Sequence, residues 1–489
     1  MMAQIAAIIG GGVIGGGWAA RFLLNGWDVN MFDPGPEAEA ALAPVLDQAR
    51  RALPGLTDVA LPTEGRLRFC SDLAEAVAGA TWIQESVPER LVVKHSVLAE
   101  VQAACPADAI IGSSTSGFKP SALQEAAARP AQIMVCHPFN PVYLMPLVEV
   151  VPSPQTDPAL VTRAQDILRG LGMFPLHVRK EIDAHIADRF LEAVWREALW
   201  LVRDGVATTE EIDEAIRMGF GIRWAQMGLF DTYRTAGGAA GMRHFMAQFG
   251  PALEWPWTKL MDVPDFTDDL VDLIAGQSDA QSGHMSIPEM LKARDDNLVG
   301  LMRALKQTNW GAGAVLNQHD AILAEEAGLE ALPNDLSTPI ATVQRVVPLD
   351  WTDYNGHMNE ARYLQAFGDA TDRFMALIGC DEAYIATGGS YFTAETHLRH
   401  LDEVHAGTRI EIVTRVISGA DKKMHLWHEM RAKDRVLATA EHFLLHVSLE
   451  TRKSCAPARH ISDTLDRIAA AHAALPMPEG LGRAVGQRP

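Results

Sequence analysis

The sequence predicts three folded parts in one chain: a doubly wound α/β domain, an all-helical domain and a C-terminal α+β module. Over residues 1–182 short apolar runs alternate with helical stretches, which is typical of a parallel sheet covered by helices. Over residues 183–328 apolar residues recur at helical spacing instead. After residue 342 one helix is followed by runs of alternating polarity, which predict antiparallel strands. The 489 residues are enough for about three such domains.

The α/β domain begins with a strand, a glycine turn, a helix and a second strand. Gln4–Ile9 and Val29–Phe32 are short apolar runs, and Val13–Asn25 lies between them as a helical stretch. Further strands are expected at Trp82–Gln84, Ala109–Gly112, Ile133–Cys136 and Leu147–Val151. Helical stretches separate most of these strands, as a doubly wound sheet requires.

The second and third parts differ from the first in their periodicity. Ile186–Val202 predicts the first long helix of the helical domain. Pro333, Asn334 and Pro339 mark residues 329–341 as a linker. The module over residues 342–475 should hold one helix and three strands, and residues 476–489, rich in Pro and Gly, should be a loose tail. The expected elements of the module are a helix at Asn359–Ile378 and strands at Arg409–Ile417, Met424–Arg431 and Val436–Leu449.

Charge and cysteine content exclude several classes of protein. The 62 acidic residues outnumber the 42 basic ones and give a net charge of −20, which argues against nucleic acid and anionic membranes as partners. The five cysteines are scattered, so we expect reduced thiols in a cytoplasmic protein. The uncharged first twenty residues include six glycines between Gly10 and Gly17, which makes a membrane-spanning helix a poor interpretation.

Gly10, Gly12 and Gly15 form a G-x-G-x-x-G motif after a strand and at the start of a helix. In that position the glycines let a backbone turn approach a pyrophosphate, and Gly11, Val13 and Ile14 complete the expected cofactor loop. Asp33 ends the second strand, where its carboxylate can accept both ribose hydroxyls and would repel a 2′-phosphate. The motif therefore predicts NAD as cofactor, and the alternative is a glycine-rich turn of another α/β protein.

His137 follows a strand in the stretch His137-Pro-Phe-Asn140-Pro141, and Glu149 lies twelve residues further on in another strand. A strand, a turn and a return strand can bring this pair together. A histidine with a carboxylate behind it can act as a general base for the oxidation of a secondary alcohol. The alternative is that His137 is a structural histidine.

These motifs occur in an order that resembles the 3-hydroxyacyl-CoA dehydrogenase family over about residues 1–325. The resemblance rests on Gly10–Gly15, Glu85-Ser-Val-Pro-Glu89 with Lys94, Ser114-Thr-Ser116, and His137–Pro141 with Glu149. It implies a Rossmann-type NAD-binding domain followed by a helical dimerisation domain, and hence a homodimer. It also implies that Glu89 and Lys94 lie near NAD, that Ser116 bonds the substrate hydroxyl, and that His137 is the base with Glu149 as its partner. For Glu89 and Lys94 a solvated helix face is the alternative interpretation.

The chain departs from the family pattern at the entry to the helical domain, and the change at Asp188 is the one that matters for the substrate. The family has Gly-Phe-Ile-x-Asn-Arg, whereas this chain has Ala184-His-Ile-Ala-Asp188-Arg189. An acid there would offset the charge of a cationic substrate, and with this change the chain resembles the branch of the family that oxidises L-carnitine. The alternative is that Asp188 only complements the helix dipole.

A trimethylammonium group has no N–H and is recognised by aromatic faces. Phe139, Tyr143 and Trp195 are candidates beside Asn140 in the substrate site, although aromatic residues of this kind are more often part of the core. Arg223 is the candidate for binding the substrate carboxylate.

The stretch Asp353-Tyr-Asn-Gly-His-Met-Asn359 precedes the helix of the C-terminal module. A thioester carbonyl placed over the helix N-terminus would be polarised, and Asp353 could then activate water or attack directly. The alternative is a capping arrangement without catalysis. With the strands that follow, the stretch resembles hotdog-fold thioesterases of the 4-hydroxybenzoyl-CoA type over about residues 340–450. The resemblance puts Asp353 at the position of the catalytic acid, with its exact role open, and Glu395 and His397 are weaker candidates. Betainyl-CoA is the expected substrate because fusion to a carnitine-oxidising part makes chemical sense if carnitine is degraded through a CoA ester of betaine.

Ten of the 17 histidines follow residue 350, but their spacing completes no metal site, so we expect no metal. Three other interpretations of the whole chain stay open. The first is a 3-hydroxyacyl-CoA dehydrogenase fused to a general acyl-CoA thioesterase. The second is a dehydrogenase with a non-catalytic hotdog dimerisation module. The third, a structural NAD-binding protein, is disfavoured by the presence of Ser116, His137 and Glu149.

Overall fold

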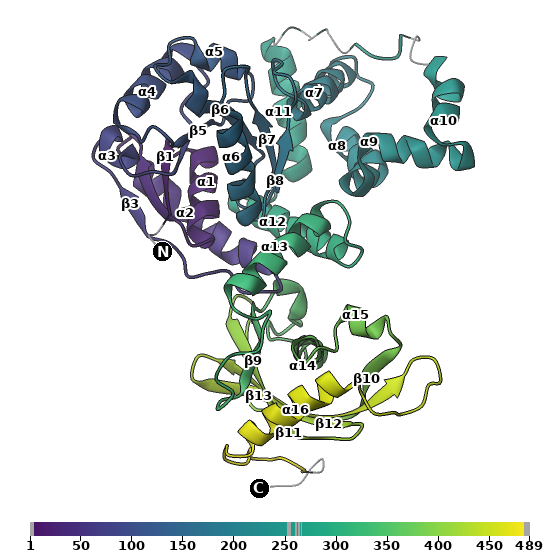
Figure 1. Ribbon diagram of the computed structural model, residues 1–489. Coiled ribbons are helices and arrows are strands. Elements are labelled where there is room, and N and C mark those ends of the chain that lie inside the picture. Colours follow the sequence, from purple (N-terminus) through teal and green to yellow (C-terminus); the bar gives the residue numbers. More distant parts are fainter. Residues whose placement is uncertain (1–3, 252–255, 260–261, 263–264, 266, 484–489) are drawn as a thin grey trace. The chain divides into compact units, whose positions relative to one another are not determined.

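A computed structural model describes residues 4–251, 256–259, 262, 265 and 267–483 of the chain. The chain divides into two compact units, shown in Figure 1. The first comprises Met1–Ala52 with Glu64–Asn317, and the second comprises Leu53–Thr63 with Gln318–Pro489. The first unit therefore contains both the expected α/β domain and most of the expected helical domain.

The first unit is built on an eight-stranded sheet with the order β3-β2-β1-β4-β5-β6-β7-β8. Neighbouring strands are parallel except that β7 runs antiparallel to β6. The predicted strands are confirmed, and β3 and β8, at the two edges, were not predicted. The strands are β1 Ile5–Ile9, β2 Asp28–Phe32, β3 Leu67–Phe69, β4 Trp82–Glu85, β5 Ile110–Ser113, β6 Ile133–Pro138, β7 Leu147–Val151 and β8 Phe174–His177.

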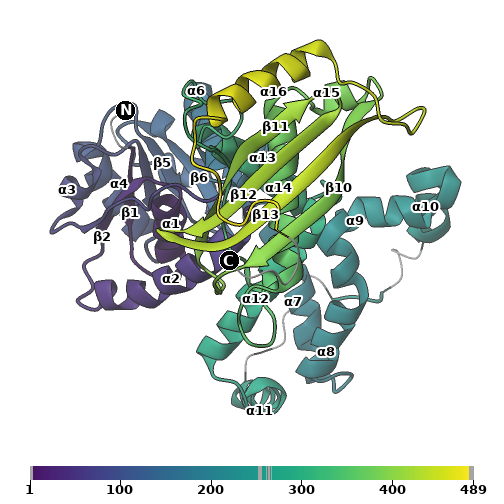
Figure 2. The same cartoon turned by 90° about the horizontal axis from the view of Figure 1, so that it is seen from below.

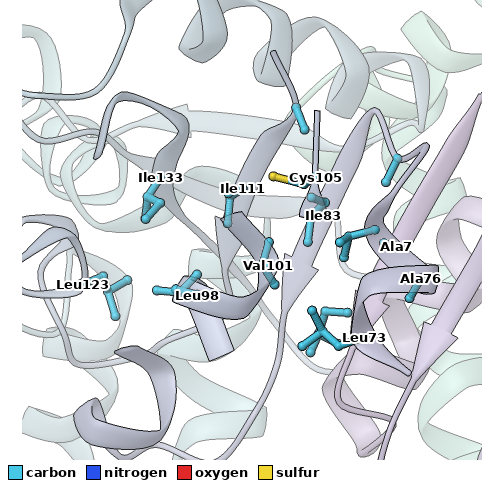
Figure 3. Close-up of a cluster of buried hydrophobic side chains, with 14 of the residues drawn as sticks. Ala7, Leu73, Ala76, Ile83, Leu98, Val101, Cys105, Ile111, Leu123 and Ile133 are labelled. Atoms are coloured by element: carbon cyan, nitrogen blue, oxygen red, sulfur yellow. The ribbon is translucent and has the colours of Figure 1, made fainter. Parts of the chain in front are cut away.

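Helices cover both faces of this sheet, because successive strand residues point to opposite sides. On one face Ile83 and Ile111 pack with Leu98 and Val101 of α4 in a buried cluster (Figure 3). Trp82, the neighbour of Ile83, packs on the other face against Trp18 of α1. The helices are α1 Val13–Leu24, α2 Ala38–Ala52, α3 Leu73–Val77, α4 Leu91–Ala104, α5 Pro120–Gln124 and α6 Pro158–Gly170. The predicted doubly wound α/β fold is confirmed.

The region after the sheet is helical in the part of the chain that the structure describes, as predicted. Its helices are α7 Ala187–Arg203, α8 Thr209–Ala215, α9 Gly221–Ala236, α10 Gly241–Phe249, α11 Asp268–Ser282, α12 Ile287–Lys306 and α13 Ala312–Glu326. None of the helices among the described residues combines the length and apolar character needed to cross a membrane.

The second unit contains a five-stranded antiparallel sheet with the order β10-β13-β12-β11-β9, which α14 covers on one face (Figure 2). Its strands are β9 Ile340–Val346, β10 Gly389–His400, β11 Arg409–Ala420, β12 Lys423–Ala432 and β13 Arg435–Ser448, and its helices are α14 Glu360–Leu377, α15 Glu382–Ile385 and α16 Arg459–His472. The α+β module is confirmed, although α16 was not predicted. Strand β9 begins at Ile340, inside the expected linker.

The segment Leu53–Thr63, the excursion, lies between two parts of the first unit in sequence but belongs to the second unit. The expected domain boundaries did not include this arrangement. The Ala60 amide donates to the Gln344 carbonyl of β9 at 2.6 Å, and the Arg345 guanidinium pairs with Asp58 at 2.8 Å. These bonds attach the excursion to the sheet edge.

A buried polar network crosses the interface between α14 and the sheet. The Thr371 hydroxyl lies 3.0 Å from both His428 Nε2 and His442 Nδ1, and His428 Nδ1 lies 2.9 Å from the Thr414 hydroxyl. Burial lowers the pKa of His428 well below its usual value and that of His442 to about 4. Both imidazoles are therefore neutral at pH 7, which suits a core that excludes water.

Two residues of the expected loose tail, Pro476 and Gly482, are hydrogen-bonded to the sheet of the second unit. The Arg415 guanidinium donates to the carbonyls of Leu475 and Pro476, and Glu441 Oε2 accepts the Gly482 amide at 2.8 Å. Composition alone could not reveal these contacts, since they use backbone groups of the tail. Residues 484–489 lie outside the described residues.

Candidate active sites

Three glycines shape the turn between β1 and α1. Gly10 has a φ of 100°, and a Cβ on it would lie 2.6 Å from the Ser86 carbonyl oxygen. A Cβ on Gly15 would lie 1.9 Å from the Gly10 carbonyl oxygen, whereas a Cβ on Gly12 would meet nothing within 4 Å. Packing therefore requires glycine at two positions, and at Gly12 the bare backbone faces space that a ligand can approach.

The N-terminus of α1 and Asp33 complete this turn. Gly12 offers no side-chain cap and the first turn holds no acid, so the amides and dipole of α1 are available to a phosphate. Asp33 Oδ2 accepts the Gly11 amide at 2.6 Å, and its Oδ1 accepts the Gly35 amide at 2.7 Å. These bonds fix the carboxylate beside the turn, where the residues present fit the pyrophosphate and ribose of NAD.

Glu85 and Lys94 form a buried ion pair behind the next loop. Lys94 Nζ lies 2.9 Å from Glu85 Oε1 and 3.1 Å from Glu89 Oε2, and both Lys94 and Glu85 are buried. The alternative of a solvated helix face is thus wrong for Lys94. Sequence reasoning overlooked Glu85, although an acid at the end of a buried strand was a signal that could have found it.

Glu89 connects this pair to the loop that carries Ser116. Its Oε1 accepts the Gly117 amide at 3.2 Å and the Thr115 hydroxyl. Burial raises the pKa of Glu89, but the bonds from Thr115, Lys94 and Gly117 outweigh it and lower the pKa overall. The ionised Glu89 therefore holds both neighbours of Ser116, whose own side chain is exposed.

His137 and Glu149 meet across the antiparallel strands β6 and β7, in direct register. His137 Nδ1 donates to Glu149 Oε2 at 3.0 Å. Glu149 Oε1 accepts the amides of Ile186 and Ala187, where α7 begins, at 2.9 and 3.0 Å. Burial raises the pKa of Glu149, but these three bonds outweigh it, so its pKa is lowered and the carboxylate stays charged. His137 Nε2, on the opposite side of the imidazole ring, makes no contact with Glu149.

Asp188 lies on that other side, in the first turn of α7. Its Oδ2 is 3.6 Å from His137 Nε2, and its side chain is 20% exposed. Burial, together with the charges of Glu149 and Glu192, raises the pKa of Asp188 against the opposing effect of His137. Asp188 lies in the first turn of α7, so it also fits the alternative in which it complements the helix dipole. In addition, its carboxylate lies beside His137 Nε2, the imidazole nitrogen that Glu149 does not contact.

His185 is a further buried neighbour that sequence reasoning missed. Its ring centroid lies 5.5 Å from that of His137, and its Nε2 lies 3.2 Å from the Thr115 carbonyl oxygen. Ala184 and His185 both have positive φ, 59° and 50°, a strained backbone for these residues. The Ala184 amide donates to the Gly117 carbonyl at 3.1 Å, so this turn is tied to the Ser116 loop.

The aromatic candidates differ in their surroundings. The Phe139 ring lies 4.9 Å from that of His137, and Asn140 beside it is exposed. Tyr143 is 3% exposed, and its hydroxyl donates to Asp295 at 2.8 Å. Since Tyr143 is occupied in joining α12 to the sheet domain, we do not retain it as a substrate contact. The third aromatic candidate, Trp195, is exposed on α7. Arg223, the candidate for binding the substrate carboxylate, is exposed on α9.

Asp353 occupies a tight turn just before α14. Its Oδ1 accepts the Asn355 amide at 2.8 Å, and its own amide donates to the His357 carbonyl at 2.9 Å. Asn359 caps α14 by accepting the Ala361 amide at 3.0 Å. The capping arrangement is therefore present, and it holds Asp353 at the N-terminal end of α14. Glu395 and His397 lie on β10, where Glu395 is exposed and His397 is half-buried.

Three family models match consecutive parts of the chain. Residues 5–182 match the NAD-binding domain of 3-hydroxyacyl-CoA dehydrogenase, and residues 185–263 match the C-terminal domain of the same family. Residues 347–485 match the thioesterase-like superfamily.

Full-length relatives carry the same three parts. A protein of Ruegeria pomeroyi named L-carnitine dehydrogenase/betainyl-CoA thioesterase is 69% identical over 98% of this chain and 99% of its own length. The chain belongs to this family. A relative of the same name from Agrobacterium fabrum is 52% identical over 98% of this chain and 97% of its own length. Family membership makes the chain an enzyme with an NAD-dependent dehydrogenase part and a thioester hydrolase part.

Shorter relatives match only the dehydrogenase part. A protein of Mesorhizobium japonicum named L-carnitine dehydrogenase is 58% identical over 66% of this chain and 90% of its own length. A solved structure of 5-formyl-3-hydroxy-2-methylpyridine 4-carboxylic acid 5-dehydrogenase, described as an NAD+-dependent dismutase, is similar to 62% of this chain and 99% of its own, with 28% identity and a TM-score of 0.54.

Proposed function

We propose that the first unit oxidises the 3-hydroxyl group of L-carnitine to 3-dehydrocarnitine with NAD. The observation that carries this proposal is the position of Asp188, 3.6 Å from the free nitrogen of His137. The names of the full-length relatives and of the shorter Mesorhizobium japonicum protein support the choice of substrate.

In the proposed mechanism His137 is the general base. Glu149 holds the proton on Nδ1, which leaves the Nε2 lone pair to take the proton of the substrate hydroxyl. The imidazolium that forms is stabilised by Glu149, at 3.0 Å from Nδ1. Ser116 is proposed to hydrogen-bond the substrate oxygen as it becomes a carbonyl. When bound at the glycine turn, NAD supplies the acceptor for the hydride.

Asp188 is proposed to recognise the trimethylammonium group. In carnitine the charged nitrogen is attached to the carbon next to the carbinol, so a hydroxyl at His137 Nε2 brings the cation close to Asp188. A quaternary ammonium cannot donate a hydrogen bond, so charge attraction and the Phe139 ring are the available interactions. This arrangement favours L-carnitine over the 3-hydroxyacyl-CoA alternative, because a neutral acyl chain gains nothing from the carboxylate.

Replacement of Asp188 by Asn tests this assignment. Loss of one partly buried charge pair should cost about 1–3 kcal/mol, so KM for L-carnitine should rise on the order of tenfold to a hundredfold. KM for NAD should stay constant. Steady-state NADH formation measures both constants.

The matched control is Glu192→Gln, which removes the next acid on α7 and should change KM for L-carnitine by less than about twofold. An Asp188→Asn variant with unchanged KM would remove the proposed role of Asp188. A wild-type enzyme that oxidises 3-hydroxybutyryl-CoA and not L-carnitine would contradict the proposed substrate itself.

For the second unit we propose hydrolysis of betainyl-CoA to betaine and CoA. The antiparallel sheet, α14 and the match to the thioesterase-like superfamily support this activity, and the names of the full-length relatives support the substrate. Asp353 is the proposed catalytic carboxylate. Either it takes a proton from water as the water oxygen bonds to the thioester carbon, or it attacks that carbon itself and water then hydrolyses the resulting anhydride. In both routes the carbon–sulfur bond breaks, and the sulfur takes up a proton and leaves as the CoA thiol. The N-terminal amides of α14 are the proposed donors to the carbonyl oxygen.

Asp353→Asn should lower kcat for betainyl-CoA hydrolysis by about a hundredfold or more, because the variant loses its base or nucleophile. Release of CoA thiol measures the reaction, and an unchanged near-UV circular dichroism spectrum and thermal unfolding curve report that the second unit, which carries Asp353, is folded. Glu360→Gln, which removes a carboxylate from the first turn of α14, is the matched control. Full hydrolysis by the Asp353 variant would exclude its catalytic role, and no hydrolysis by the wild type would favour a non-catalytic module.

We further propose that the chain works as a homodimer in the cytoplasm. Several apolar side chains of α7 are exposed: Phe190, Leu191 and Trp195 are each 56% exposed, and Val194 is 37% exposed. An apolar helix face of this kind is suited to contact with a second copy. The cysteines are all free, in agreement with a reducing compartment. Sedimentation of the purified chain tests the dimer, and a mass of one chain would contradict it.

A further inference from the structure

Two histidines and a glutamate converge on the surface beside the turn of Asp353. His357 Nε2 lies 3.5 Å from Glu403 Oε2, and the ring centroids of His357 and His405 are 4.6 Å apart. One ligand-type atom from each of the three side chains lies within 4.8 Å of the others. The established family and the proposed mechanisms leave this cluster unused.

The backbone around these side chains is held by the core. The Met358 amide donates to the Val404 carbonyl at 2.8 Å, and His357 forms an isolated antiparallel bridge with His405. Met358 and Val404 are both buried, 4% and 1% exposed, in the cluster beneath α14. His357 is adjacent in sequence to Met358, and Glu403 and His405 are adjacent to Val404. The backbone of all three residues is therefore held in place by a buried neighbour.

The spacing and the chemical types fit a transition metal. A tetrahedral zinc ion with bonds of about 2.0–2.2 Å separates its ligand atoms by about 3.3–3.5 Å. The His357–Glu403 distance already has this value, and small rotations of exposed side chains would bring His405 to it. Imidazole nitrogens favour Zn²⁺, Ni²⁺ and related ions over Ca²⁺ or Mg²⁺.

His405 also has the second contact that a metal-binding histidine normally uses. Its Nδ1 lies 3.0 Å from the Gly356 carbonyl oxygen, an arrangement in which Nδ1 donates and Nε2 keeps a free lone pair. Metal-bound histidines commonly donate their other nitrogen to a backbone carbonyl, which orients the ring. Here that carbonyl belongs to the Asp353–His357 turn.

We propose that His357, Glu403 and His405 bind one divalent transition-metal ion of the zinc class, with water as the remaining ligand. Through His357 and Gly356 the ion ties the turn of Asp353 to residues 403–405. This proposal replaces the expectation of no metal, and it does not depend on either proposed activity. The sequence did not reveal the site, because 46 residues separate His357 from Glu403.

Titration of the untagged full-length chain with Co²⁺ and Zn²⁺ tests the site. One Co²⁺ per chain should bind with the visible absorption of a tetrahedral complex, and Zn²⁺ should displace it. His405→Ala and Glu403→Gln should each raise Kd at least about tenfold. His284→Ala, which removes an exposed histidine of the first unit, should leave Kd unchanged.

Hydrogen exchange supplies a second measurement. Added Zn²⁺ should slow exchange of the amides over residues 353–358 in the wild type and not in His405→Ala. An unchanged near-UV circular dichroism spectrum and thermal unfolding curve in the absence of metal confirm that the second unit, which holds the site, is folded in each variant. The proposal is overturned if the wild type shows no saturable binding of one ion, or if His405→Ala binds Co²⁺ as tightly as the wild type does.

Discussion

The dehydrogenase part of the structure depends on the carboxylate of Glu149. One carboxylate oxygen accepts a hydrogen bond from Nδ1 of His137. The other accepts hydrogen bonds from the two backbone amides at which α7 begins. These bonds keep a fully buried carboxylate charged, although burial alone would favour its neutral form. The same group thereby orients the general base and fixes the helix that carries Asp188.

This shared anchor explains why the base and the cation-recognising residue lie together. His137 belongs to the sheet, whereas Asp188 belongs to the helical region. The turn at Ala184 and His185 adds bonds to the loop of Ser116. Ser116, His137 and Asp188 therefore come from separate segments that are held to one another by hydrogen bonds of the Glu149 and His185 side chains and of the Ala184 amide.

Sequence patterns predicted the elements and residues whose chemistry is local. The glycine turn with Asp33, and His137 with Glu149, were predicted because short strands and turns fix their geometry. The helix α16 was missed, although Ile461, Leu465 and Ile468 recur in it at helical spacing. Lys94 was left open as a surface residue, since its burial depends on the partner Glu85, which composition cannot identify.

Other features depend on contacts between distant segments, which periodicity does not encode. Tyr143 was expected near the substrate, but Asp295, 152 residues away, binds its hydroxyl. The cluster of His357, Glu403 and His405 forms only when two loops pair. His185 was visible as a change from the family pattern, and its contact with His137 required the fold.

The kinetics of a Glu149→Gln variant test the central claim most directly. An amide keeps the size of the side chain but loses the charge, so it should lower kcat for L-carnitine oxidation by about 10²–10⁴-fold. KM for NAD and betainyl-CoA hydrolysis by the same chain should be unchanged. A kcat within about twofold of the wild type would contradict the role of Glu149 in holding His137 as the base.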